Sequence, residues 1–398
     1  MFRRVLAEKV SSLAKQFPVV FITGPRQSGK TTLAKTTFGR YEYVNLEDPD
    51  SRDFARRDPV GFLKRYSRDV ILDEVQNVPD LLSVMQLRVD EDSSPGRFIL
   101  TGSQQLPLTR SISQTLAGRT AVCVLLPLSM EELTGIQAGD PWNVASPETP
   151  SSKPSFSLEW LLHQGLYPRV HDKALIAYDW LASYYTTYIE RDVRDFARIG
   201  DLETFQRFVR LCAGRSGSLL NLSSLAADCG ISHTTARSWI STLQATFVVH
   251  LLPPHYANFS KRLIKSPKLY FYDSGLLCYL LRIRGHDDLV DHAMRGPVFE
   301  TYVLSEILKA FMHRGENPPV YFWHERTGRE VDIIIDDGKK LLPIEVKSGR
   351  TITSELFKGL DYFTALGPPA ASSGVLVYGG EEMYQREGFL VRPWYKCV

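Results

Sequence analysis

The stretch "FITGPRQSGKTTLAK" combines glycines, a lysine and hydroxyl side chains in a spacing that can grip a triphosphate. It matches the pattern G-x-x-x-x-G-K-[ST] from Gly24 to Thr31, between an apolar strand pattern and a helical one. Backbone amides and a helix dipole would face the phosphates. Lys30 would neutralise the β- and γ-phosphates, Thr31 would offer its hydroxyl to Mg²⁺, and Thr32 would reach the α-phosphate. A chance glycine-rich turn is the alternative. The predicted nucleotide-binding residues are Gly24, Pro25, Arg26, Gln27, Ser28, Gly29, Lys30, Thr31 and Thr32.

Two acids follow the apolar run in "DVILDEVQ", where a Walker B strand would deliver them. Asp73 would hold Mg²⁺ together with Thr31, and Glu74 would polarise the attacking water. The alternative is a pair of solvated acids at the end of a strand. A phosphate loop upstream favours the catalytic interpretation.

Two further residues are candidates for sensing the γ-phosphate. Ser103 follows the apolar strand in "RFILTGSQQ". Arg119 follows a glycine in "SISQTLAGRT", where an arginine of one subunit could reach the γ-phosphate of a neighbour in a ring. The alternative role of Arg119, capping its own helix, has equal weight.

A second group of charged residues lies near the carboxyl end, in "GREVDIIIDDGKKLLPIEVKSG". Glu345 and Lys347 share one face of their strand because side chains alternate, and an antiparallel neighbour would bring Asp332 beside them. Two converging carboxylates, Asp332 and Glu345, can bind Mg²⁺, and a lysine can orient or deprotonate water. The stretch resembles the PD-(D/E)xK nuclease fold, which also implies a helical glutamate, here Glu300. A structural ion-pair network is the alternative.

Between these groups, "LNLSSLAADCGISHTTARSWISTLQ" reads as helix, turn and helix, with Ser223 and Ser232 as caps and Gly230 in the turn. A strand-like run and a basic segment follow, which is a DNA-binding layout. A winged helix used only for packing or subunit contact is the alternative. The predicted DNA-binding residues are His233, Thr234 and Arg237, with Lys261, Arg262 and Lys265 in a basic wing that also contains Lys268.

The elements that must position these residues form an α/β pattern. In the first third, uniformly apolar runs alternate with helical stretches, which predicts a parallel sheet covered on both faces. A Pro- and Ser-rich segment then separates this core from a mostly helical region, and the chain returns to mixed strand and helix.

The motifs together resemble the AAA+ ATPases of bacteria and archaea that carry a C-terminal domain of unknown function. The resemblance covers nearly the whole chain, including "YIERDVRDF" and "SPKLYFYDSGLL". It implies a P-loop AAA+ core at 1–135, a linker at 136–157, a helical and winged-helix-like domain at 158–285 and a restriction-endonuclease-like domain at 286–398. It also implies ATP and Mg²⁺ as cofactors and a homo-oligomer such as a hexameric ring. A sensor-2 arginine on a helical lid is not evident.

The composition is that of an ordinary globular protein: 398 residues, 43% hydrophobic and 23% charged, with a formal net charge of +2. The five scattered cysteines suggest neither a zinc site nor a disulfide framework. No signal peptide or membrane-spanning run is evident, so we expect a cytoplasmic protein without a membrane partner.

Three functions are consistent with these patterns. The first is an ATPase that acts on DNA and cuts nucleic acid at the C-terminal site. The second is an ATP-controlled switch or adaptor that holds DNA or a protein without cutting. The third is a nucleotide-binding regulator whose helix-turn-helix contacts another protein.

Overall fold

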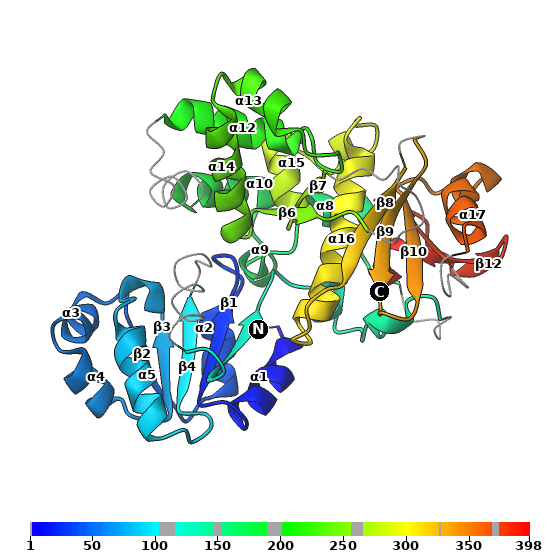
Figure 1. Cartoon of the computed structure of the whole chain (residues 1–398). Coiled ribbons are helices and arrows are strands. Elements are labelled where there is room, and N and C mark those ends of the chain that lie inside the picture. The colour runs from blue at the N-terminus through cyan, green and yellow to red at the C-terminus, as the bar shows by residue number, and fades with distance from the viewer. Residues whose placement is uncertain are drawn as a thin grey trace. The chain divides into compact units, whose positions relative to one another are not determined.

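A computed structural model describes residues 2–102, 116–146, 153–188, 201–255, 266–325, 328–367 and 374–398 (Figure 1). The chain divides into two compact units. Unit 1 comprises Met1–Leu128, Ala245–Phe247 and Phe311–Glu316, and unit 2 comprises Ser129–Gln244, Val248–Ala310 and Asn317–Val398.

Unit 1 is built on a parallel five-stranded sheet in the order β2-β3-β4-β1-β5. Each predicted apolar run of the first third contains one of these strands, so the predicted parallel sheet is confirmed. Because all strands run the same way, the residues that follow β1, β3 and β4 meet at one edge of the sheet. The strands are β1 (Val19–Thr23), β2 (Glu42–Asn45), β3 (Val70–Asp73), β4 (Phe98–Gly102) and β5 (Thr120–Val124).

Alternation along the strands produces two hydrophobic cores, one on each face of this sheet. Val19 and Phe21 of β1 pack in one core, whereas Val20 and Ile22 pack in the other. Burial on both faces explains why the strands are apolar throughout. The first core includes residues of α3 (Pro49–Arg57), α4 (Pro59–Arg65) and α5 (Leu81–Glu91), and the second includes residues of α1 (Leu6–Ala14) and α2 (Lys30–Thr37). The short η1 (Val75–Asn77) follows β3.

Unit 2 begins with a mostly helical region. Its core includes Trp239 of α14, whose ring meets Phe205 and Phe208 of α12 edge to face at 5.3 and 5.2 Å. The helices are α7 (Met130–Thr134), η2 (Pro141–Asn143), α8 (Leu158–Gln164), α9 (Pro168–Asp172), α10 (Ala177–Tyr184), α12 (Leu202–Ala213), α13 (Leu222–Cys229), α14 (His233–Ala245), α15 (Ser274–Leu280) and η4 (Asp287–Leu289).

Helices α13 and α14 form the predicted helix-turn-helix. Gly230 ends α13 with φ 69°, and the Ser232 hydroxyl accepts a hydrogen bond from the Thr235 amide at 3.0 Å. The predicted cap Ser223 is wrong, because α13 starts two residues earlier than that cap would place it, and Asn221 accepts the hydrogen bond from the Ser224 amide. The antiparallel hairpin of β6 (Val249–Leu252) and β7 (Lys268–Phe271) follows.

The C-terminal part of unit 2 holds a mixed six-stranded sheet in the order β12-β13-β11-β10-β9-β8. Its strands are β8 (Val320–His324), β9 (Glu330–Asp336), β10 (Leu341–Lys347), β11 (Val375–Tyr378), β12 (Tyr384–Arg386) and β13 (Phe389–Pro393), and its helices are α16 (Arg295–Met312), η5 (Ser354–Phe357), α17 (Lys358–Ala365) and η6 (Trp394–Lys396). Strands β9 and β10 form the predicted hairpin, with Ile344 opposite Ile333.

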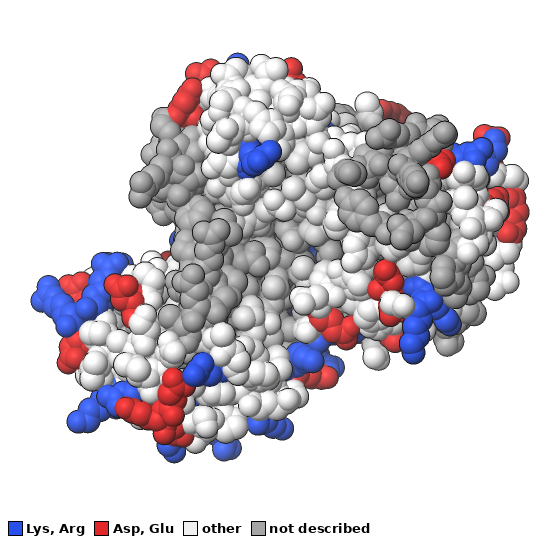
Figure 2. All heavy atoms as spheres, in the orientation of Figure 1, with Lys and Arg blue, Asp and Glu red and all other residues white. Residues whose placement is uncertain are grey.

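Charge is distributed without a dominant sign. On the face drawn in Figure 2, acidic and basic side chains are interspersed over unit 1. Within the described ranges, the structure contains no helix with the length and apolar character that crossing a bilayer requires.

Candidate active sites

The phosphate loop runs from the end of β1 to the start of α2 in a backbone shape that depends on glycine. Gly24 has φ 145°, and a Cβ there would lie 2.1 Å from the Leu125 carbonyl oxygen. Gly29 has φ 96° immediately before α2. The Arg4 guanidinium links the loop to the segment that follows β5, because it donates hydrogen bonds to the carbonyl oxygens of Ser28 at 2.5 Å and Leu126 at 2.6 Å.

Lys30 lies inside this loop and is 5% exposed. Its ammonium donates to the carbonyl oxygens of Gly24 at 3.1 Å and Pro25 at 2.8 Å. Burial lowers the pKa of Lys30 to about 8, despite the opposing charges of Glu74 and Asp73. In the described part of the chain no carboxylate lies within ion-pair distance of Lys30, and the buried Ser28 hydroxyl also has no hydrogen-bond partner. A buried cation and an unsatisfied hydroxyl facing the same loop fit a bound triphosphate.

The carboxylate of Asp73, at the end of β3, is surrounded by hydroxyl groups. Thr31 lies 2.9 Å from Oδ2 and 3.1 Å from Oδ1, Tyr43 donates to Oδ2 at 2.7 Å, and Thr101 donates to Oδ1. The Thr31 hydroxyl and the Asp73 carboxylate are hard oxygen donors in contact, so this pair fits the ligand preference of Mg²⁺. Tyr43 and Thr101 are functional candidates that the sequence analysis missed. Burial and the contact with Asp73 raise the pKa of Tyr43.

Glu74 has an unusual backbone conformation. Its φ of 57° and ψ of 46° place a non-glycine residue in the left-handed region, which is uncommon and often occurs at functional sites. The Gln76 amide donates to its Oε2, and its own backbone amide donates to the Thr101 hydroxyl at 3.4 Å. The Glu74 carboxylate is therefore held beside Asp73 at the edge where the phosphate loop lies.

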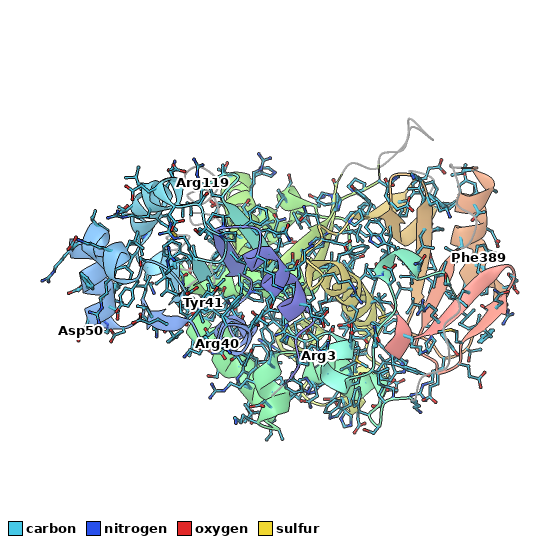
Figure 3. The ribbon with its side chains drawn as sticks, turned by 90° about the horizontal axis from the view of Figure 1, so that it is seen from below. Arg3, Arg40, Tyr41, Asp50, Arg119 and Phe389 are labelled. Carbon is cyan, nitrogen blue, oxygen red and sulfur yellow. The ribbon has the colours of Figure 1, made fainter. Side chains whose placement is uncertain are left out.

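Arg119 lies at the opposite end of the sheet. It precedes β5, whose first residue, Thr120, pairs with Val19, whereas the phosphate loop follows Thr23. The five residues of β5 span about 16 Å, so Arg119 does not reach the phosphate loop of its own chain. Its Nε forms an ion pair with Asp90 of α5 at 2.5 Å, and it is labelled in Figure 3. Ser103 lies outside the described residues.

The C-terminal candidates are brought together at one place in unit 2. The pairing of β8 with β9 advances two residues on β8, from Tyr321 to Trp323, but three on β9, from Ile334 to Val331. Asp332 lies in this bulge, a feature that often re-aims a side chain near a site. Its Oδ2 accepts a hydrogen bond from the Val346 amide at 2.9 Å, just beyond the last β9–β10 pair.

Lys347 joins the two strands electrostatically. Its ammonium lies 2.7 Å from Glu345 Oε1 and 3.6 Å from Asp332 Oδ2. Glu345 Oε2 is buried without a hydrogen-bond partner. Burial, together with the charge of Asp332, raises the pKa of Glu345 well above its usual range. Burial alone would lower the pKa of Lys347, but the two carboxylates outweigh it and raise that pKa.

Glu300 of α16 belongs to the same cluster, but two residues that the sequence analysis did not place there contact it directly. The Tyr270 hydroxyl donates to Glu300 Oε1, and the Lys268 ammonium lies 3.7 Å from the same oxygen. Lys268 was predicted in the basic wing, yet it is 4% exposed. Burial and the charge of Asp332 raise the pKa of Glu300. We call Glu300, Glu330, Asp332, Glu345, Lys268 and Lys347 the acidic cluster.

The acidic cluster does not present a ready metal site. Over the residues that the structure describes, no three Asp, Glu, His or Cys side chains are grouped so as to hold a metal ion. Lysine ammonium groups lie among the carboxylates instead. The Oε2 atom of Glu345 is buried without a hydrogen-bond partner, which is a reason to expect a further cation near the cluster.

The helix-turn-helix places its predicted contact residues on the surface. His233, Thr234 and Arg237 are exposed along α14, while Ala236 and Trp239 are buried. The predicted wing residues Lys261, Arg262 and Lys265 lie outside the described residues.

Three families match this chain. Residues 16–134 match an AAA domain, residues 155–287 match a domain of unknown function (DUF8612), and residues 295–396 match another domain of unknown function (DUF4143). Residues 16–134, which contain the phosphate loop, therefore match an AAA domain, and the C-terminal residues 295–396 match a domain of unknown function. This is the combination of an AAA+ ATPase domain with a C-terminal domain of unknown function that the sequence motifs predicted.

Curated relatives include uncharacterized proteins of Mycobacterium tuberculosis and Mycobacterium bovis. Each is 29% identical over 388 residues, which is 96% of this chain and 81% of the relative. A Walker-type ATPase of Pyrococcus abyssi is 12% identical, covers 69% of this chain and 94% of its own, and has a TM-score of 0.37. The RuvB Holliday junction branch migration motor of Thermotoga maritima is 17% identical over 63% of this chain and 90% of its own, with a TM-score of 0.32.

Proposed function

We propose that unit 1 binds ATP with Mg²⁺ and hydrolyses the γ-phosphate. The observation that carries this proposal is the buried Lys30 ammonium, which contacts only loop carbonyls and lies within a glycine-dependent loop. Loop amides and Lys30 would bind the phosphates, and Thr31 and Asp73 would hold the metal ion, which supplies charge neutralisation when bound. Glu74 would orient the attacking water and accept its proton, with Gln76 fixing the carboxylate.

We also propose that Arg119 acts on the nucleotide of a neighbouring subunit, which makes the active protein a homo-oligomer. Its position at the end of β5 away from its own phosphate loop supports action in trans. The neighbouring arginine would stabilise charge on the transferred phosphoryl group. The competing role is structural, through the ion pair with Asp90.

Mixing two inactive variants tests the role of Arg119. Arg119→Ala and Lys30→Ala proteins should each hydrolyse ATP poorly alone. In random equimolar mixed rings, about a quarter of the sites combine an intact loop with an intact neighbouring arginine, so about a quarter of wild-type turnover should return. Phosphate release is the measurement. Turnover in verified mixed oligomers that stays at the sum of the separate variants would contradict action in trans.

For the C-terminal domain we propose metal-dependent cleavage of nucleic acid. Asp332, Glu345 and Lys347 converge at one edge of the β9–β10 hairpin, and this convergence carries the proposal. Asp332 and Glu345 are the residues that would hold a divalent ion, and Lys347 would orient or deprotonate the water that attacks a phosphodiester. Glu300 would support the site from α16. The exposed His233, Thr234 and Arg237 would contact the DNA backbone.

A cleavage assay tests this proposal. Plasmid, linear and branched DNA are incubated with Mg²⁺ or Mn²⁺, with and without ATP. Asp332→Ala and Lys347→Ala should each lower cleavage by about 100-fold or more, because each removes a group that contacts the reacting atoms. Asp337→Ala, which removes an exposed acid from the adjoining turn, is the matched control and should cut normally. Equal nicking by all three variants would identify a contaminant and reject the assignment.

An adaptor that holds DNA or a protein without cutting is the second candidate function. The lysines among the carboxylates favour it, because they satisfy the acids electrostatically in the way a structural ion-pair network would. In that case wild-type protein would shift DNA in a salt-dependent manner but leave every substrate intact with either metal.

A further inference from the structure

Lys268 connects the β6–β7 hairpin to the acidic cluster. Its side chain is 5% exposed, and its ammonium lies 3.3 Å from Glu330 Oε2, 3.7 Å from Glu300 Oε1 and 3.9 Å from Asp332 Oδ1. Glu300 belongs to α16, whereas Glu330 and Asp332 belong to β9. One ammonium group therefore neutralises carboxylates from two different elements.

The carboxylates of the acidic cluster need nearby positive charge in order to be ionised. Burial and the charge of Asp332 both disfavour the ionised forms of Glu300 and Glu345 and raise the pKa of each. The Lys347 ammonium compensates the negative charge of Glu345, and the Lys268 ammonium compensates that of Glu300. Burial alone would lower the pKa of Lys268, but the charges of Glu300, Asp332 and Glu330 outweigh burial and raise it. Lys268 therefore stays protonated and contributes a positive charge to the acidic cluster.

One of the oxygens that face Lys268 belongs to Asp332, a residue proposed above to hold the divalent ion. Asp332 Oδ2 is already engaged by the Val346 amide and lies near Lys347, which leaves Oδ1 as the oxygen open to a new ligand. Oδ1 faces Lys268, as does Glu300 Oε1. A divalent ion binds carboxylate oxygens at about 2.0–2.6 Å. An ion on Asp332 Oδ1 would therefore lie within a few ångströms of the ammonium, where the two cations repel strongly.

We propose that the Lys268 ammonium and a divalent cation are alternative occupants of the acidic cluster, so that the cluster takes up Mg²⁺ or Mn²⁺ only when the lysine side chain leaves. This inference rests on the proposed metal-dependent function. If so, the β6–β7 hairpin is part of the C-terminal site, because Lys268 is the first residue of β7. Under the competing view, Lys268 is a permanent structural counter-ion and a metal ion binds while the lysine stays buried.

Mn²⁺ binding to the full-length protein, measured by calorimetry without nucleic acid, tests the competition. Lys268→Met keeps the length of the side chain but removes its charge. It should bind Mn²⁺ at least about tenfold more tightly than the wild type, because the competing cation is gone. Lys340→Met is the matched control, since Lys340 is exposed in the β9–β10 turn, and its affinity should equal that of the wild type. Equal affinities of Lys268→Met and the wild type would overturn the proposal.

Acetylation of Lys268 in the wild-type protein provides a test that does not depend on how the variant folds. A lysine this buried should resist a brief exposure to acetic anhydride, and mass spectrometry should detect its modification as Mn²⁺ approaches saturation. If Lys268 stays protected while Mn²⁺ binds, the proposal is rejected and the lysine is a permanent counter-ion. If Mn²⁺ and Lys268 compete as expected but the protein cuts no nucleic acid, the proposed cleavage is rejected and the proposed competition stands.

Discussion

Replacing Glu74 with glutamine should leave ATP bound to unit 1 but lower steady-state phosphate release by about 100-fold or more. Glutamine has nearly the same shape, so Asp73 and the phosphate loop keep their contacts. It cannot accept the proton of the attacking water. Equilibrium binding of ATP and release of phosphate, measured on the same preparation, separate the two effects.

Glu42→Gln is the matched control for this result. Glu42 is an exposed acid at the first residue of β2, at the end of the sheet away from the phosphate loop, so the same chemical change there should not affect turnover. Normal turnover in Glu74→Gln would remove Glu74 from the mechanism. The left-handed backbone of Glu74 would then need another explanation.

Replacing Lys30 with alanine should weaken ATP binding by about 100-fold or more. The ammonium is buried at the position where phosphate charge would lie, and a buried charge-assisted contact is worth on the order of 3 kcal/mol. Titration with a fluorescent ATP analogue measures the change. Because two loop carbonyls also lose a donor, a thermal melt should accompany the titration to show that the variant is folded.

Lys35→Ala is the control for charge on the same helix. Lys35 belongs to α2, is exposed, and places its ammonium 3.3 Å from the centre of the Tyr43 ring. Removing it changes the net charge equally but takes nothing from the loop. Comparable binding losses in folded Lys30→Ala and Lys35→Ala proteins would mean that general electrostatic attraction, not the loop lysine, holds the nucleotide.

Local patterns explain why much of unit 1 could be predicted. The β1 strand is apolar from Val19 to Ile22 because both of its faces are buried. The loop after it has the G-x-x-x-x-G-K-[ST] spacing of glycines, lysine and threonine, which is characteristic of phosphate loops. The side-chain alternation that joins Glu345 to Lys347 is equally local. These features depend on residues that are close to one another in the sequence, so they can be predicted from the sequence alone.

Contacts between distant segments could not be predicted in the same way. Lys268 followed a basic run, which suggested a solvent-facing wing, but tertiary packing buries it against Glu300 and Asp332. Tyr43 gave no signal, because nothing in "YEYVNLED" tells which tyrosine will meet Asp73. The bulge that turns Asp332 is a one-residue mismatch between β8 and β9, visible only once their register is known.

The most direct test of the central claim is calorimetric titration of the wild-type protein with ATP and Mg²⁺, followed by measurement of phosphate release from the same sample. The arrangement of Lys30, Thr31, Asp73 and Glu74 predicts one nucleotide per chain and its conversion to ADP. A folded wild-type protein that binds no adenine nucleotide at millimolar concentration would contradict the assignment of this site.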